Sequence, residues 1–128
     1  MIHLSDYTSS ILKFVKSRQM AFVYIFATEG KPPCKIGYGL NLKNRLEQLQ
    51  AAQPRRLTIE YIAWCPNAPT AALIAEGLRH RLVEFEVRAG WYLKIPEAIA
   101  EVRKACSMFP SFGIIEHGVL MQRLGAVR

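Results

Sequence analysis

Apolar and polar positions alternate along the chain in a way that predicts three short strands. Residues 21–27 are aromatic and β-branched, which is typical of a buried strand. Residues 34–38 and 57–64 predict two more strands, and the first of these is expected to pair antiparallel with 21–27. Segment 28–33 holds a glycine and two prolines and is expected to be a loop. A further short extended segment is predicted at 91–95.

Amphipathic helices are predicted between and around these strands. Asn41 can cap a helix, and Pro54 ends it. Between them Leu42, Leu46 and Leu49 form one apolar stripe at helical spacing. The other predicted helices cover residues 5–18, 70–87, 97–108 and 114–124.

These elements predict an α/β fold of the α+β kind, with a small, mainly antiparallel, three-stranded sheet flanked by helices. A chain of 128 residues has room for one core and little room for two. The expected organisation is a helical extension over 1–20, a central domain over 21–95 and a C-terminal helical extension over 96–128. We expect the C-terminal extension to pack on the same domain.

The charge favours a polyanionic partner. The net charge is +7 and the pI is about 9.6, which makes nucleic acid a more natural partner than an anionic membrane surface. Six cations and one acid lie between residues 31 and 56. The candidate nucleic-acid contacts outside any catalytic group are Lys31, Lys43, Arg55 and Arg56.

The cysteines and the apolar runs indicate the compartment. Cys34, Cys65 and Cys106 are widely spaced and odd in number, which predicts reduced thiols rather than disulfides or a zinc site. The longest apolar run, 20–27, is too short to cross a bilayer, and the first residues do not form a signal peptide. We therefore expect an intracellular, cytoplasmic protein with no membrane partner and no small-molecule cofactor.

Candidate chemistry gathers around a glycine-rich bend at 37–39. Tyr24 lies on the strand before the bend, Lys35 and Tyr38 flank it, and Arg45 returns toward it from the next helix. Cations and hydroxyls around a flexible bend suit the binding of a phosphate. Each residue also has an ordinary structural role, as a packed strand tyrosine, an edge-strand charge or a solvated helix arginine.

A second group is predicted on the longest helix. Glu76 and His80 are four residues apart, within a stripe that also contains Leu73, Val83 and Val87. A carboxylate and an imidazole there are expected to be partly buried, which is costly unless they are paired or bind a metal. An i,i+4 hydrogen bond between the two is the simpler interpretation. A zinc site is disfavoured because no third ligand is visible.

The order of these motifs resembles that of a known nuclease superfamily. The matching residues are VYI at 23–25, KIG at 35–37, RLEQLQ at 45–50, Pro54, Glu76, His80 and Trp91-Tyr92. Over about residues 21–95 the chain resembles the GIY-YIG superfamily, and more closely its phage-ORF-like branch, which is also named for a meiotically up-regulated gene.

The resemblance implies a GIY-YIG-like fold, a prokaryotic or phage-derived origin and a role for each matching residue. Tyr24 stands at the tyrosine of the first motif, and Lys35 replaces the tyrosine of the second, as is usual in this branch. Gly37 holds the glycine of that motif, and Arg45 lies at the catalytic arginine. Glu76 matches the carboxylate that holds one Mg²⁺ or Mn²⁺ ion.

Phosphodiester hydrolysis by such a site gives each of these groups an expected role. Arg45 is expected to bind a non-bridging phosphate oxygen, and the metal ion to stabilise the leaving oxygen. Tyr24 is expected to orient or deprotonate the water, with its pKa lowered by neighbouring charge that includes Lys35. Tyr38 and His80 are second candidates for proton transfer.

Three functions follow from this interpretation. The first is a metal-dependent DNA endonuclease. The second is a basic nucleic-acid-binding module without catalysis, which is motivated by one departure from the branch: Gly90 stands where a glutamate often precedes the tryptophan. The third is an interaction domain whose C-terminal helix builds a homodimer.

Overall fold

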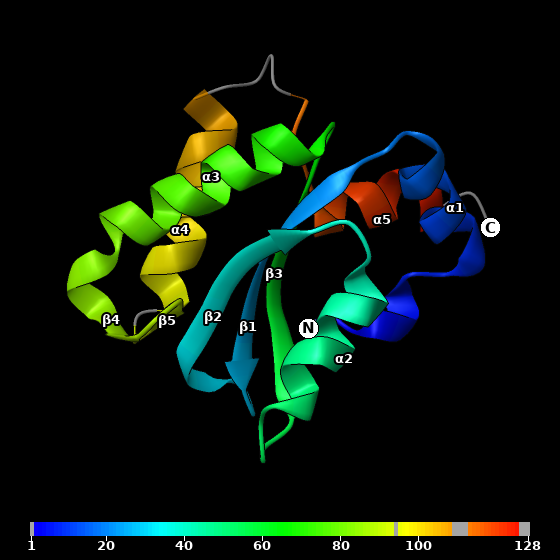
Figure 1. Cartoon of the computed structure of the whole chain (residues 1–128). Helices are drawn as coiled ribbons and strands as arrows, with labels where there is room; N and C mark the ends of the chain where they lie inside the picture. Colours follow the sequence, from blue (N-terminus) through cyan, green and yellow to red (C-terminus); the bar gives the residue numbers. More distant parts are fainter. Residues whose placement is uncertain (1, 94, 109–112, 126–128) are drawn as a thin grey trace.

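The computed structural model describes residues 2–93, 95–108 and 113–125, which form an α+β fold. Strands and helices alternate along most of the chain (Figure 1). In chain order they are η1 (Leu4–Asp6), α1 (Ser9–Ser17), β1 (Ala21–Thr28), β2 (Lys31–Gly39), α2 (Leu42–Ala51), β3 (Leu57–Cys65), α3 (Ala68–Arg81), η2 (Val83–Phe85), β4 (Glu86–Arg88), β5 (Trp91–Tyr92), α4 (Ile95–Met108), β6 (Ile115–Glu116) and α5 (His117–Gly125).

The sheet is larger than predicted. It has six antiparallel strands in the order β4-β5-β2-β1-β3-β6, so the expectation of a small three-stranded sheet is wrong. The predicted strands form its centre. The additional strands have two or three residues each. Such segments are too short to show a periodicity, and only pairing with distant parts of the chain makes them strands.

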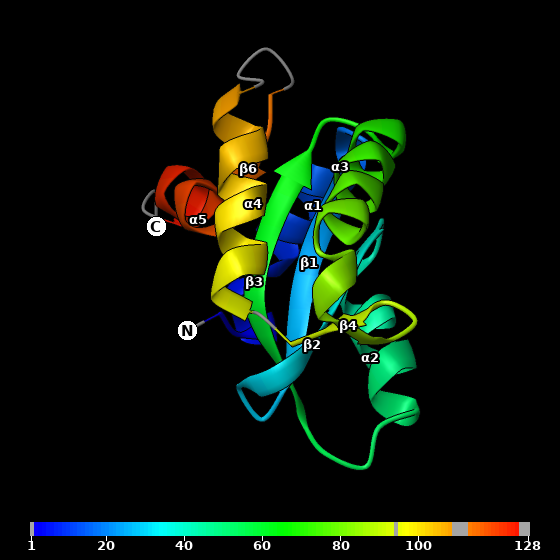
Figure 2. The ribbon, with the colours of Figure 1, turned by 90° about the vertical axis from the view of Figure 1, so that its left-hand side faces the viewer.

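The sheet separates two apolar cores. Odd-numbered residues of β1, such as Val23 and Ile25, face α3 and α4, whereas Phe22, Tyr24 and Phe26 face the core that includes Leu42. This alternation follows from the two-residue period of a strand. α3 and α4 lie on the near side of the sheet in Figure 2, and α1 lies on the far side. Val102 of α4 belongs to one of these cores and Leu120 of α5 to the other, so both helices pack on the same sheet.

The start of the chain differs from the prediction. The expected helix over 5–18 is a short 3₁₀ turn followed by α1, because Thr8 caps the helix by accepting a hydrogen bond from the backbone of Ile11. The expected loop over 28–33 is a tight turn at Glu29 and Gly30, and β2 already begins at Lys31. Its Pro-Pro pair is tolerated because β5 pairs only further along β2.

The long helix predicted over 70–87 is also shorter than expected. It is capped by Asn67, ends at Arg81 and is followed by η2 and β4. The predicted second apolar stripe is wrong, because Leu73, Val83 and Val87 are 64%, 60% and 50% exposed. α3 buries one face, against the sheet and α4, and nothing among the described residues covers the other face.

The predicted C-terminal helix over 114–124 begins later than expected. Ile115 belongs to β6, and α5 starts at His117. Leu120 of α5 is buried, whereas Val119 is exposed. Among the described residues no helix has both the length and the apolarity needed to cross a membrane.

Candidate active site

Tyr24 lies at the centre of the site, on β1. Its ring stacks on Phe26 at 4.2 Å between centroids and tilts against Phe22 at 5.9 Å. Its cross-strand partner on β2 is Gly37. The side chain of Tyr24 is 0% exposed. The tyrosine is thus enclosed by its neighbours on both strands.

Gly37 provides the space that the Tyr24 ring occupies. A Cβ atom at this position would overlap the tyrosine hydroxyl and would lie 2.7 Å from Cζ. Because real Cβ contacts are not this short, a side chain here would displace the ring. The glycine of the KIG motif therefore has a packing reason in this fold.

Arg45 closes the site from α2. Asn41 fixes the start of this helix by accepting a hydrogen bond from the backbone of Asn44 at 3.0 Å. One turn later, Arg45 Nε donates to the Tyr24 hydroxyl at 3.1 Å, and its Cζ lies 5.7 Å from the centre of the Tyr24 ring. The arginine stem passes Gly39, where a Cβ would be 3.7 Å from Arg45 Cγ. Tyr24 and Arg45 are thus brought together as predicted.

The pKa of Tyr24 is raised above its ordinary value, so the protein's own cations do not produce the expected lowering. Burial is the largest cause, and it outweighs the hydrogen bond from Arg45 and the positive charges of Arg45 and Arg79. Tyr24 is therefore a neutral phenol at physiological pH. Since its oxygen accepts from Arg45, the hydroxyl holds the guanidinium in place.

Lys35 lies on β2 opposite Phe26, two residues along β1 from Tyr24, and therefore on the same face of the sheet as Tyr24. It pairs with Phe26 on one side and with Trp91 on the other. Its Nζ atom is 3.5 Å from the carbonyl oxygen of Ala89 and 6.0 Å from the centre of the Trp91 ring. Burial lowers the pKa of Lys35, and the charges of nearby arginines lower it further.

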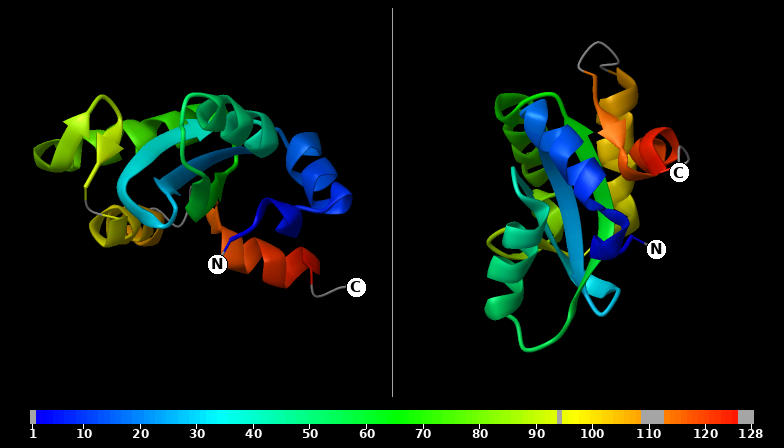
Figure 3. Two further views of the ribbon diagram at one scale, coloured as in Figure 1. Left: turned by 90° about the horizontal axis from the view of Figure 1, so that it is seen from below. Right: turned by 90° about the vertical axis from the view of Figure 1, so that its right-hand side faces the viewer.

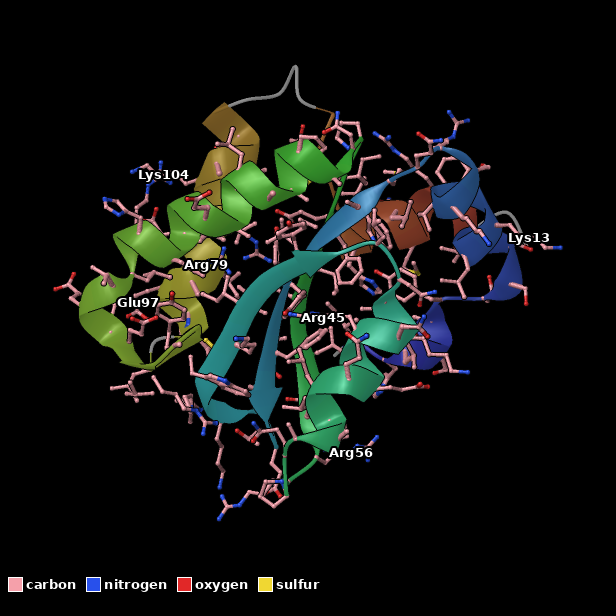
Figure 4. All side chains as sticks on the ribbon, viewed as in Figure 1. Lys13, Arg45, Arg56, Arg79, Glu97 and Lys104 are labelled. Atoms are coloured by element: carbon pink, nitrogen blue, oxygen red, sulfur yellow. The ribbon has the colours of Figure 1, made fainter. Side chains whose placement is uncertain are left out.

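Two arginines that the sequence reasoning missed complete the group. Arg88, on β4, lies with Cζ 4.6 Å from the centre of the Trp91 ring. The field of Arg79, on α3, acts on both Tyr24 and Lys35. Figure 4 shows Arg79 beside α3 and Arg45 beside α2, with β2 between the two helices. The helical spacing of Arg79, three residues after Glu76, was the signal that could have found it.

Glu76 and His80 are both exposed on α3, so the prediction that they are partly buried is wrong. The reason is the single buried face of α3: Ala75 and Leu78 occupy it, and Glu76 and His80 lie further round. Arg79 and His80 follow Glu76 by three and four residues, so all three side chains lie on one side of the helix. No hydrogen bond joins Glu76 to His80 among the described residues.

The carboxylates present allow only an open metal site. Among the described residues, no three or more His, Cys, Asp and Glu side chains are grouped to hold a metal ion. A hard cation such as Mg²⁺ accepts one carboxylate and completes its shell with water and substrate oxygens. Glu76, which is exposed on α3, supplies one carboxylate of this kind.

The remaining predicted residues lie away from this group. Tyr38 follows Gly37 on β2 and therefore points to the opposite face of the sheet, where it is 40% exposed. Lys31 begins β2, Lys43 lies in the first turn of α2, and Arg55 and Arg56 precede β3; all four are exposed. The backbone of Arg56 binds the turn between β1 and β2.

A separate groove of about 600 Å³ lies beside α2, lined by residues of the N-terminal segment, α2 and β3. It contains Glu29, Glu47 and Arg56, but none of the predicted catalytic residues. The candidate site is therefore an open surface around the edge of β2 and not this groove.

Comparisons with protein-family models, with curated proteins and with solved structures found no match to the chain.

Proposed function

We propose that the chain is a metal-dependent DNA endonuclease of the GIY-YIG type, acting at the site formed by Tyr24, Arg45 and Lys35. One observation carries the proposal: Arg45 Nε is held 3.1 Å from the Tyr24 hydroxyl, above a glycine that makes room for the ring. Residues 21 positions apart thus place a planar cation next to a phenol, and the fork of that cation suits a phosphate group.

In this proposal each side chain has a defined task. Arg45 exchanges the Tyr24 hydroxyl for a non-bridging phosphate oxygen, which its fork can bind through two N–H groups. Lys35 adds positive charge on the same face. Glu76 would hold the Mg²⁺ or Mn²⁺ ion, which when bound would supply charge stabilisation at the leaving oxygen. Tyr24 becomes reachable by water when Arg45 moves to the phosphate, and its hydroxyl then orients the attacking water.

The test is cleavage of plasmid and branched DNA by the purified protein with Mg²⁺ or Mn²⁺. Arg45→Ala and Glu76→Ala are each expected to lower the rate by roughly 10²–10³-fold, the usual effect of losing one electrostatic stabiliser. Lys104→Ala, an exposed cation on α4, is the matched control and should cleave normally. Equal cleavage by all variants, or no cleavage by the wild type under any condition, would refute the proposal.

A second candidate function is a DNA-binding module without catalysis. It is favoured by the enclosure of Tyr24, which is 0% exposed, together with its raised pKa. Such a module would bind DNA without a metal ion, and its affinity would fall steeply with salt. Metal-independent binding combined with no cleavage would select this candidate over the first.

A further inference from the structure

Three cations follow one line across the sheet, and a fourth acts on them from a neighbouring helix. Arg45 lies over β1, Lys35 on β2 and Arg88 beside Trp91 of β5, while Arg79 adds its charge from α3. We propose that these four residues, the cation array, bind two neighbouring phosphates of one DNA strand, with one phosphate at Arg45 and the next toward Arg88. This inference rests on the proposed function, since it describes how the substrate lies on the same site.

The array has little internal compensation. Among the described residues the ion pairs involve Arg81, Arg103 and His117, and none involves an array member. The carboxylate that acts on Lys35 is that of Glu86, and it raises the pKa of the lysine. Glu86 also accepts a hydrogen bond from the backbone of Gly90 at 3.1 Å. Cations gathered without partners raise the local positive potential, which favours an anionic ligand.

The pKa of Lys35 shows that the members of the cation array lie close enough to repel one another. Its pKa is lowered first by burial and then by the charges of Arg45, Arg79 and Arg88. A phosphate placed among them would reverse this effect, because it stabilises the protonated amine. The mutual repulsion in the free protein is therefore relieved by the ligand that we propose.

The cation array is longer than the reach of a single phosphate group. β1, β2 and β5 are successive neighbours in the sheet. Two strand spacings amount to about 10 Å. A nucleic-acid strand carries one charge for roughly every 3.4 Å of helix axis. A ligand with one phosphate therefore cannot contact both ends. Two adjacent phosphates cover part of this length, and the long side chains of Arg45 and Arg88 can reach inward to cover the rest.

The array recognises the backbone and not the bases. Trp91 is only 7% exposed, and the guanidinium of Arg88 lies over its ring. The indole is therefore already covered and does not offer a surface on which a base can stack. Contacts limited to phosphates carry no direct sequence information, so binding to the array should be independent of base sequence.

The experiment is a salt titration of binding to a fluorescent mixed-sequence DNA 12-mer, without metal. Arg79→Ala and Arg88→Ala should each reduce the slope of log K against log salt by about 0.7–0.9, the value for one lost phosphate contact. Arg88→Gln keeps a stem over Trp91 and should reduce it similarly, which separates charge from packing. Lys104→Ala, with the same loss of charge on α4, should leave the slope nearly unchanged.

Neutral methylphosphonate linkages locate the two phosphates. On a DNA trinucleotide, whose two phosphate linkages leave the array no other register, neutralising either linkage should weaken wild-type binding. One of the two effects should disappear in Arg88→Ala and the other in Arg45→Ala. Arginine variants with the same slope as Lys104→Ala, or sensitivity at a single linkage only, would overturn the array.

Parallel cleavage assays separate this inference from the proposed function. Slope changes without any cleavage would support the array and remove the nuclease. Cleavage by the wild type, together with unchanged binding by the arginine variants, would remove the array and keep the nuclease.

Discussion

At the scale of single residues, the site depends on the absence of a side chain at Gly37. Tyr24 is enclosed by Phe22, Phe26 and Arg45, so its ring cannot move away freely. We expect Gly37→Ala to destabilise the fold by about 1–3 kcal/mol through overpacking. Urea denaturation followed by circular dichroism measures this change.

Gly77→Ala is the matched control for that substitution. Gly77 lies inside α3, and a Cβ there meets no atom within 4 Å. Alanine should therefore leave stability unchanged or raise it by up to about 1 kcal/mol, as helix propensity predicts. If both alanine variants behaved alike, the packing role of Gly37 would be wrong.

The residue scale also shows how far sequence reasoning reaches into the site. Spacing correctly brought Arg45 to Tyr24, because a capped helix directly after a two-stranded turn leaves little freedom in where it points. Spacing could not predict that Tyr24 is enclosed, because the enclosure depends on Phe22 and Phe26. It also could not predict the direction in which the pKa of Tyr24 is shifted. Arg88 was missed because its place depends on the short β4–β5 hairpin.

At the scale of elements, α2 depends strongly on its cap. Only Leu42 of this helix is fully buried, so packing supplies less stability than for α3. Asn41→Ala removes the acceptor for the backbone of Asn44 and should cost about 0.5–2 kcal/mol. Asn41→Asp, which keeps an acceptor, and Asn44→Ala, an exposed position in the first turn, should both stay close to the wild type.

Thermal melting compares these variants, and DNA binding gives a second measurement. Because α2 carries Arg45, Asn41→Ala should also weaken binding through loss of order at the arginine. Loss of stability without any loss of binding would mean that α2 does not need its cap to place Arg45.

Elements differ in how well their sequence determines them. β1, β3 and α2 have strong local patterns and lie close to their predicted positions. The predicted end of α3 was wrong because the apolar residues Val83 and Val87 continue the helical period, although the chain has already left the helix and forms a hairpin there. A period alone does not tell whether a stripe is covered, which depends on the elements that pack against it.

At the scale of the whole molecule, one polar network joins the two ends of the chain. Trp64 Nε1 donates to the Tyr7 hydroxyl at 3.0 Å, and Tyr7 lies 2.8 Å from His117 Nδ1. The other ring nitrogen of His117 lies 3.5 Å from Asp6. Figure 3 shows the N-terminal residues beside α5. With a neutral imidazole, Tyr7 donates to Nδ1 and every member of the network has a partner.

This network predicts a loss of stability in acid. Burial lowers the pKa of His117 below its ordinary value of 6.5, and Asp6 opposes the effect only partly. Because the folded pKa is lowered, the contribution to stability is complete above about pH 6.5 and is lost as the pH falls from there through the folded pKa. His117→Asn keeps an acceptor for Tyr7 and should flatten the dependence of urea stability between pH 7.5 and 5.5.

His80→Asn provides the control, because His80 is exposed on α3. Its stability curve should follow the wild type. A wild-type curve that is already flat over this range would show that His117 does not couple folding to pH.

The edges of the sheet have a consequence for how copies of the protein meet. The outermost strands, β4 and β6, have only three and two residues. They cover little of the long strands behind them, because β6 pairs only with Ala63 and Trp64 of β3, and β5 only with Cys34 and Lys35 of β2. Much of the outer side of β2 and β3 therefore keeps backbone groups to which a further strand can pair. Copies of the protein can associate at these open stretches as well as through the exposed side of α3 around Leu73.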